Sequence, residues 1–406
     1  MKATGDHVPH GGETFKNEAA MNSSNDSSTT YHALASERLE RLWHAVYDTP
    51  CPASARSRLD AMLLPWGSAK IPSAPAWPSD IGDDHSPYEF SLALAPNEPP
   101  SVRFLVEAQS TTGGSPTLAD MRDAALALTR RLAEDGGDLT RFERVRDIFL
   151  PDVASARFAL WHAARLSGPP EVKAYFNPQI AGKERSFELV ESAMRTLGFG
   201  SAWPSLLEAV QRQTSDDEIR YFALDLAAGG AARVKVYFYQ RGVTVEHLER
   251  MAAIRPGYEE GEVTAFCRAM LGAREASETF PLCTYLSFVE GEPTPKEVAI
   301  QIPIRFYAPN DAVARERVVS YMQSRGHSPA VFEAALQSLA PRELDAASGL
   351  LTYVSLRTGT DRLTFYVATE LFAAAAAAAS EEQPLPARVA RRQSSQSTGL
   401  PQGKIP

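Results

Sequence analysis

Apolar and polar residues alternate along short segments of this chain, and the segments come in pairs. An alternation of period two places every second side chain on one face of a β-strand. The first members of the pairs are residues 89–94, 157–162, 221–226, 284–289 and 352–357. The second members are residues 102–107, 172–178, 234–240, 299–306 and 363–368. Each series advances by about 60–70 residues, so the sequence predicts five repeated β-hairpins.

Segments of helical periodicity lie between successive hairpins. They cover residues 117–134, 186–198, 245–254, 262–273 and 311–326, and an earlier one covers residues 36–48. Thr117 is a candidate N-cap, and Gly326 with Arg325 beside it is a helix-stop signal. Ten twisted antiparallel strands tend to curl, and closure removes their exposed edges. We therefore expect an α+β fold, a ten-stranded antiparallel β-barrel surrounded by helices.

Composition and charge narrow the class of protein. The 406 residues carry a net charge of −9, which argues against a nucleic-acid partner. Cys51, Cys267 and Cys283 form no C-x-x-C pair, so neither a disulfide framework nor a zinc site is indicated. No apolar run reaches the ~20 residues of a membrane span, and the first residues lack a signal-peptide core. These features favour a cytoplasmic protein.

The two ends differ in composition from the region between them. Residues 1–30 are rich in Ser, Asn and Thr, and residues 380–406 are rich in Gln, Ser and Pro with a small basic cluster. We expect both ends to be disordered. Residues 31–379 then form a single barrel domain, with a helix end in the alanine run 373–379.

Helices outside the barrel require apolar residues on its outer face, which turns the polar residues inward. In VKAYFNP the outward set is Val172, Ala174 and Phe176. The inward set is Arg103, Lys173, Tyr175, Asn177, Arg233, Lys235, Tyr237 and Tyr239, with Gln301 and Arg305 sharing a face of the segment 299–306. For one strand, a sheet with a solvated face would explain such residues better. Their recurrence at equivalent positions favours a polar, cationic and aromatic lumen.

Several converging cations require an anion, since burying unpaired charge is costly. A diphosphate fits, because arginine gives forked contacts and lysine gives point charges. Tyrosine ring faces attract a carbocation by about 0.5–2 kcal/mol each. Together these residues predict a site that ionises an allylic diphosphate.

The quoted segments VKAYFNP and RVKVYF, with EFS at residues 89–91, resemble the indole prenyltransferases of the dimethylallyltryptophan synthase family in their bacterial form. The resemblance covers about residues 36–372 and implies five ααββ repeats, the ABBA fold. It also implies a diphosphate-releasing alkyltransferase that moves a dimethylallyl group from dimethylallyl diphosphate to the indole of tryptophan or a tryptophan-derived compound. The expected reaction is a Friedel-Crafts alkylation without a metal cofactor, with Mg²⁺ or Ca²⁺ as an enhancer at most. A monomer or homodimer is expected.

The resemblance also implies roles for individual residues. The expected diphosphate-binding residues are Arg103, Lys173, Arg233 and Lys235. The expected carbocation shield is Tyr175, Tyr237 and Tyr366. The expected acceptor-binding residues are Glu89, at the indole N–H, and Arg357, at the amino-acid end.

Two departures from the family pattern affect these roles. Gln301 stands where a cage tyrosine is usual, and we expect it to bind the diphosphate instead. The family's occasional lysine base is not evident, and His162 lies in that region, so it is a candidate base beside Glu89 although a lone histidine is more often structural. Asp216 and Asp217 are better explained as a loop or helix cap than as a metal site.

Two alternatives stay open at this point. The acceptor could be a phenol such as tyrosine or a hydroxynaphthalene, or the barrel could bind a hydrophobic anion without catalysis. Glu89 distinguishes the carrier from the enzyme, because a carrier gains nothing from a carboxylate beside a bound anion.

Overall fold

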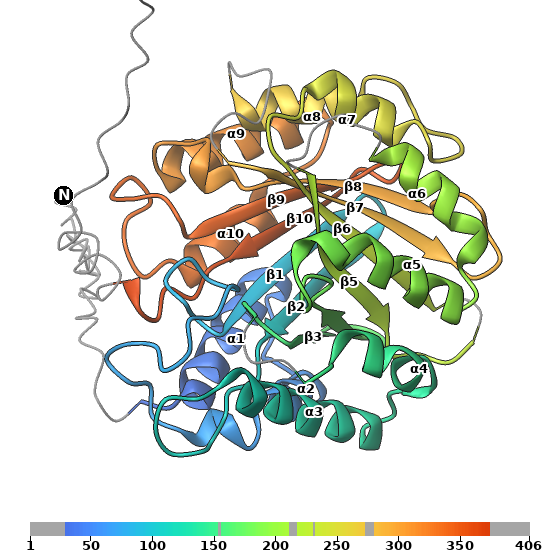
Figure 1. The fold of residues 1–406 in the computed structure, drawn as a ribbon. Helices are drawn as coiled ribbons and strands as arrows, with labels where there is room; N and C mark the ends of the chain where they lie inside the picture. The colour runs from blue at the N-terminus through green and yellow to red at the C-terminus, as the bar shows by residue number, and fades with distance from the viewer. Residues whose placement is uncertain (1–28, 153–155, 211–216, 230–231, 273–279, 374–406) are drawn as a thin grey trace, which may run out of the picture.

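A computed structural model describes residues 29–152, 156–210, 217–229, 232–272 and 280–373 of the chain (Figure 1). The expected disordered ends lie outside these residues, apart from Thr29 and Thr30, and so does the alanine run beyond residue 373. Thr30 is the N-cap of the first helix, and its side chain accepts from the N–H of Ala33 at 3.1 Å. The extent of the single domain at both ends stays a prediction.

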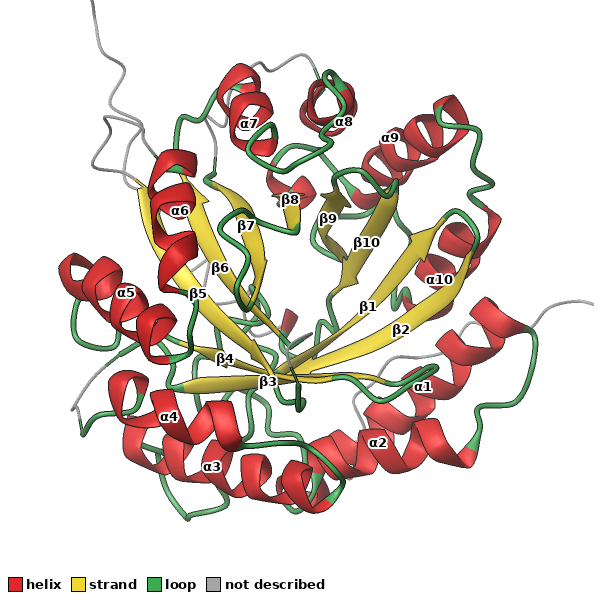
Figure 2. Cartoon of the chain, turned by 90° about the vertical axis from the view of Figure 1, so that its right-hand side faces the viewer, coloured by secondary structure: helices red, strands yellow, loops and turns green. Residues whose placement is uncertain are grey.

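The described residues form ten strands that close into one antiparallel barrel, as the alternation predicted (Figure 2). The strands are β1 (Tyr88–Ala95), β2 (Glu98–Val106), β3 (Leu160–Arg165), β4 (Val172–Phe176), β5 (Asp217–Asp225), β6 (Arg233–Gln240), β7 (Leu282–Val289), β8 (Glu297–Ile302), β9 (Leu351–Arg357) and β10 (Arg362–Val367). Each strand pairs with its neighbours in the sequence, and β1 also pairs with β10, which closes the barrel.

Two helices precede each hairpin in the described residues, and together they surround the barrel (Figure 2). They are α1 (Tyr31–Tyr47), α2 (Ala53–Leu63), α3 (Leu118–Glu134), α4 (Thr140–Phe149), α5 (Ser186–Thr196), α6 (Trp203–Ala209), α7 (Val245–Ala252), α8 (Glu262–Leu271), α9 (Asp311–Ser324) and α10 (Ala330–Leu339). The unit is therefore ααββ, repeated five times. None of the helices in the described ranges is long and apolar enough to cross a membrane.

The hydrophobic core lies between the outer face of the barrel and the helices. Phe176 shows the principle: its ring stacks on those of Phe142 and Phe149, both on α4, with centroids 5.2 and 5.1 Å apart. Such stacked pairs add to the free energy gained by burying their area. Thr117 caps α3 in a reciprocal capping box with Asp120, as its position predicted. The apolar outer face leaves the polar residues for the lumen.

Pro303 changes one predicted strand. Because proline has no N–H for the ladder, β8 ends at Ile302 and a short 3₁₀ helix, η4 (Ile304–Phe306), follows. Arg305 therefore reaches the lumen from η4 and not from the strand on which we placed it. Asn177 also differs from the expectation, since it lies beyond β4 and donates to the carbonyl of Phe158 at 2.9 Å.

Candidate active site

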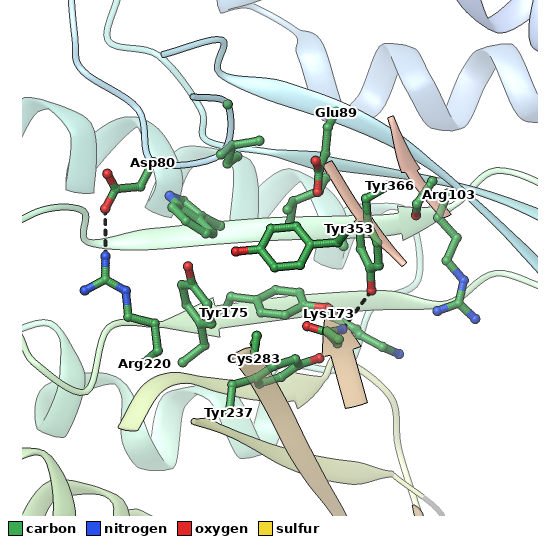
Figure 3. Close-up of a pocket in the computed structure, with 18 of the residues that line it drawn as sticks. Asp80, Glu89, Arg103, Lys173, Tyr175, Arg220, Tyr237, Cys283, Tyr353 and Tyr366 are labelled. Carbon is green, nitrogen blue, oxygen red and sulfur yellow. Dashed lines mark hydrogen bonds and ion pairs between the residues drawn. The ribbon is translucent and has the colours of Figure 1, made fainter. Parts of the chain in front are cut away.

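A cavity of about 350 Å³ occupies the lumen, and all ten strands contribute residues to its wall. The volume lies in the range of small-molecule sites. Figure 3 shows Asp80 and Arg220 on one side of a group of tyrosines, with Arg103 and Lys173 on the other. The cavity therefore has two charged ends and an aromatic middle.

Positive side chains converge with carboxylates at one end of the barrel. The cations are Arg103, Arg165, Lys173, Arg233, Lys235 and Arg357. The carboxylates are Glu171, Asp225 and Glu297. We call these nine residues the ion cluster. Six cations against three carboxylates leave a formal excess of three positive charges in the described residues.

The carboxylates of the ion cluster bridge the cations. Asp225 accepts from Lys173 Nζ at 2.7 Å and from Arg233 Nε at 2.9 Å. Glu297 lies 3.0 Å from Arg357, 3.3 Å from Arg233 and 3.5 Å from Lys235. The sequence reasoning missed these acids, because Asp225 ends a first strand and Glu297 lies just before the segment 299–306 that was taken as the second strand. The anion that the inward cations were expected to require is therefore supplied in part by the protein's own carboxylates.

The pKa values in the ion cluster follow from burial and from these pairs. Burial lowers the pKa of Lys173, which Asp225 and Glu171 partly offset. For Asp225, burial alone would raise the pKa, but Lys173 and Arg233 hold it below its usual value. The anions beside the lysine thus favour its charged form against the effect of burial.

Tyrosines form the middle of the cavity. Tyr175, Tyr237 and Tyr366 line it, as predicted. The rings of Tyr175 and Tyr237 lie 5.9 Å apart, and the Gln301 side-chain amide donates to the hydroxyl of Tyr366 at 3.1 Å. Gln301 thus supports the tyrosine group. Tyr239, predicted to face inward, also lines the cavity. Further tyrosines that the sequence did not assign complete the group: Tyr221 and Tyr353 line the cavity, and the ring of Tyr285 lies 4.9 Å from that of Tyr237.

Glu89 is buried in the wall beside these rings, with an exposed fraction of 7%. Thr352 Oγ1 donates to its Oε2 at 3.5 Å. Burial raises the pKa of Glu89 to about 8, although the nearby Arg305 opposes this shift. Glu89 is therefore a carboxyl that changes charge near neutral pH, inside the cavity and within reach of a ligand.

The second charged end of the cavity contains two arginines and two aspartates. Arg220 lies 3.0 Å from Asp80 and over the ring of Tyr239, and Arg305 pairs with Asp83 and lies over the ring of Tyr353. The sequence reasoning did not assign Arg220 to the site. A β-bulge between Ile219 and Tyr221 explains this, because it breaks the alternation and brings both Arg220 and Tyr221 to the cavity.

Two predicted site residues lie elsewhere than expected. His162 is fully buried on the outer side, where its Nε2 is 2.9 Å from Thr129 Oγ1 of α3, and burial lowers its pKa to about 3. It does not line the cavity, which argues against a role as the base. Arg357 pairs with Glu297 in the ion cluster, so its position indicates contact with an anion there and not with the amino-acid end of an acceptor.

The chain matches known proteins over most of its length. The family model described as tryptophan dimethylallyltransferase matches residues 62–334. A structure named 6-dimethylallyl tryptophan synthase is 31% identical, with a TM-score of 0.79, over 85% of this chain and 98% of its own. The 6-dimethylallyltryptophan synthase of Micromonospora olivasterospora, solved with DMASPP and Trp, is 33% identical, with a TM-score of 0.76, over 85% and 98%. The 5-dimethylallyltryptophan synthase of Streptomyces coelicolor is 28% identical, with a TM-score of 0.76, over 85% and 99%.

Proposed function

The chain belongs to the tryptophan dimethylallyltransferase family, and on this basis we propose that its lumen joins the dimethylallyl group of dimethylallyl diphosphate to the indole ring of tryptophan. It is a prenyltransferase. We assign the roles from one observation: Glu89 and the tyrosines lie between the ion cluster and the arginines of the second charged end.

The ion cluster is the proposed diphosphate site. Arg103 and Lys173 reach the cavity, and Arg233, Lys235 and Arg357 stand behind them. When the allylic C–O bond breaks, the electron pair leaves with the diphosphate, whose charge these cations stabilise. Because they are already in place, the stabilisation needs little reorganisation at the moment of ionisation.

The tyrosine group is the proposed shield of the dimethylallyl cation. Ring faces stabilise a cation placed over them, and enclosed rings also exclude the water that would trap it. Tyr175 and Tyr366 are half-buried in the cavity wall, and burial raises the pKa of Tyr175 to about 12. These hydroxyls therefore stay protonated and do not add negative charge that would capture the cation.

Glu89 and the second charged end are the proposed acceptor site. Ionised Glu89 accepts the indole N–H and so raises the electron density of the ring. Arg220 and Arg305 face the carboxylate of the amino acid, and Asp80 and Asp83 face its ammonium group. Both reactants are then held together in one enclosed space, which lowers the entropic part of the barrier.

The transfer ends with loss of a proton from the alkylated ring carbon. The new C–C bond leaves the ring cationic, and removal of this proton restores aromaticity. Glu89 is the proposed acceptor of the proton, because it is a carboxylate in the cavity wall with its pKa raised by burial to about 8. A base with such a pKa is suited to neutral pH.

We also propose that the reaction needs no metal ion, because the cations of the ion cluster already supply the charge for the diphosphate. The test is incubation of the purified protein with L-tryptophan and dimethylallyl diphosphate, with EDTA or with Mg²⁺, followed by mass spectrometry. We expect a monoprenylated tryptophan in both samples. Product only with Mg²⁺ would contradict metal independence. If tryptophan gives no product and a phenol incubated in its place does, the acceptor belongs to another class.

A further inference from the structure

Glu171 differs from the other two carboxylates of the ion cluster in its position. It lies immediately before β4 and lines the cavity, whereas Asp225 and Glu297 do not. Its carboxylate pairs with Arg165 and Lys173, and its Oε1 lies 3.3 Å from Arg233. One cavity-facing anion therefore engages three of the cations that the proposed function assigns to the diphosphate or places beside it.

We propose that the Glu171 carboxylate occupies part of the diphosphate site when the protein is empty, leaves when the donor binds, and returns as diphosphate departs. This inference rests on the proposed function and deepens it. Glu171 would then be a residue that sets the affinity for diphosphate and promotes release of this product. Its carboxylate is an internal competitor, so the protein binds the anion more weakly than its cations alone would.

The contacts explain why Glu171, and not Asp225, is the exchangeable anion. Asp225 Oδ2 accepts from the backbone N–H of Arg233 at 3.2 Å as well as from its guanidinium, so its carboxylate is fixed to the backbone. Within the described residues, the Glu171 carboxylate accepts from side chains and from no backbone N–H, while its backbone carbonyl accepts from the N–H of Arg165 at 2.9 Å. Its side chain can therefore rotate away while its backbone stays in place.

Charge gives the reason for the exchange. A diphosphate ester carries roughly three negative charges near neutral pH, since its terminal phosphate is mostly doubly ionised. It needs the same N–H donors that Glu171 now uses, and a carboxylate left beside it would repel it. Protonation does not remove Glu171, because Lys173 and Arg103 hold its pKa far below the usual range despite burial. The exchange is therefore a competition between two anions.

The test is calorimetric titration of the full chain with inorganic diphosphate, in the wild type, Glu171→Gln and Asp225→Asn. We expect Glu171→Gln to bind diphosphate about tenfold more tightly, because the substitution removes the negative charge that competes with it. A neighbouring charge within contact distance typically shifts a pKa by about one unit or more, which corresponds to a factor of about ten. Asp225→Asn removes a charge of the same size, but from behind Lys173 and Arg233. Because these two cations then lose the partner that fixes them, this variant should bind diphosphate no more tightly than the wild type. In the prenylation assay, added diphosphate should inhibit Glu171→Gln at about a tenth of the concentration that inhibits the wild type.

Three outcomes would contradict the proposal. Unchanged or weaker binding by Glu171→Gln would overturn the competition. Equal tightening in both variants would also overturn it, because it would show a general effect of charge. A wild type that prenylates and binds diphosphate, with no change in Glu171→Gln, would leave the proposed function intact. A wild type that binds no diphosphate would refute both.

A second variant keeps the proposal testable if Glu171→Gln folds poorly. Glu171→Asp keeps the charge but withdraws it by one methylene, so we expect tighter binding by a smaller factor. Thermal unfolding gives an independent measure, since a ligand that binds more tightly stabilises more at the same concentration. Diphosphate should thus raise the Tm of both Glu171 variants by more than that of the wild type, and an equal or smaller rise would contradict the proposal.

Discussion

Lys173 Nζ lies 2.7 Å from Oδ1 of Asp225, its register partner across strands β4 and β5. The pair is buried, and Glu171 contacts the same ammonium group. Lys173 is therefore held between two carboxylates before any substrate arrives. Its position is set in advance of the diphosphate it is proposed to bind, and its loss leaves two carboxylates with fewer partners.

Replacing Lys173 should affect both binding and stability. We expect Lys173→Met to weaken diphosphate binding about 100-fold or more and to lower the free energy of unfolding by about 3 kcal/mol, because breaking a buried ion pair leaves uncompensated charge. Titration calorimetry and urea unfolding measure the two effects. Lys183→Met, at an exposed position before α5, is the matched control and should change neither.

The charge of Glu89 should control the rate. Because the carboxylate form is needed at the indole N–H and burial raises its pKa to about 8, kcat/KM for tryptophan should rise with pH up to about this value. Glu89→Gln should lower kcat by about 10²–10⁴, the usual range for losing such a group, and should flatten this part of the profile. Diphosphate affinity serves as the control and should stay unchanged. A variant that keeps the wild-type rate and profile would remove Glu89 from the mechanism.

Arg220 should distinguish acceptors with a carboxylate from those without one. We expect Arg220→Gln to raise the KM for tryptophan about 10–100-fold, since it loses a charge-assisted contact. Tryptamine and indole lack the carboxylate, so their kcat/KM should change by less than about threefold between the two proteins. Steady-state assays with the three acceptors give the comparison. An equal loss for all three would show that Arg220 shapes the cavity and does not bind the carboxylate.

Glu107 should make stability depend on pH. It is 2% exposed, and burial raises its pKa to about 7 from the ordinary 4.5. The folded state therefore favours the neutral acid. The contribution of Glu107 to the free energy of unfolding is full below about pH 4.5 and is lost as pH rises through 7. Between pH 4.5 and 8 the free energy of unfolding of the wild type should fall by up to roughly 3 kcal/mol relative to that of Glu107→Gln. Urea unfolding of both proteins at several pH values measures this, and parallel curves would contradict it.

Much of the fold follows from the period-two alternation and its repeat. Val172, Ala174 and Phe176 point to the helices, and Lys173 and Tyr175 point to the cavity, as the alternation predicted. The sites that could not be predicted depend on breaks in this regularity or on contacts between distant strands. The bulge at Arg220 and the pairing of Arg357 with Glu297 are visible only when the barrel is closed, whereas Pro303 already marks the end of β8 in the sequence.

The most direct test of the two-ended site is a crystal structure of the protein with dimethylallyl thiolodiphosphate and L-tryptophan. We predict the diphosphate oxygens within hydrogen-bond distance of Arg103, Lys173 and Arg233, with Glu171 turned away from them. The indole N–H should donate to Glu89, and the tryptophan carboxylate should contact Arg220 or Arg305. A diphosphate bound at Arg220 and Arg305, with tryptophan against the ion cluster, would contradict the account.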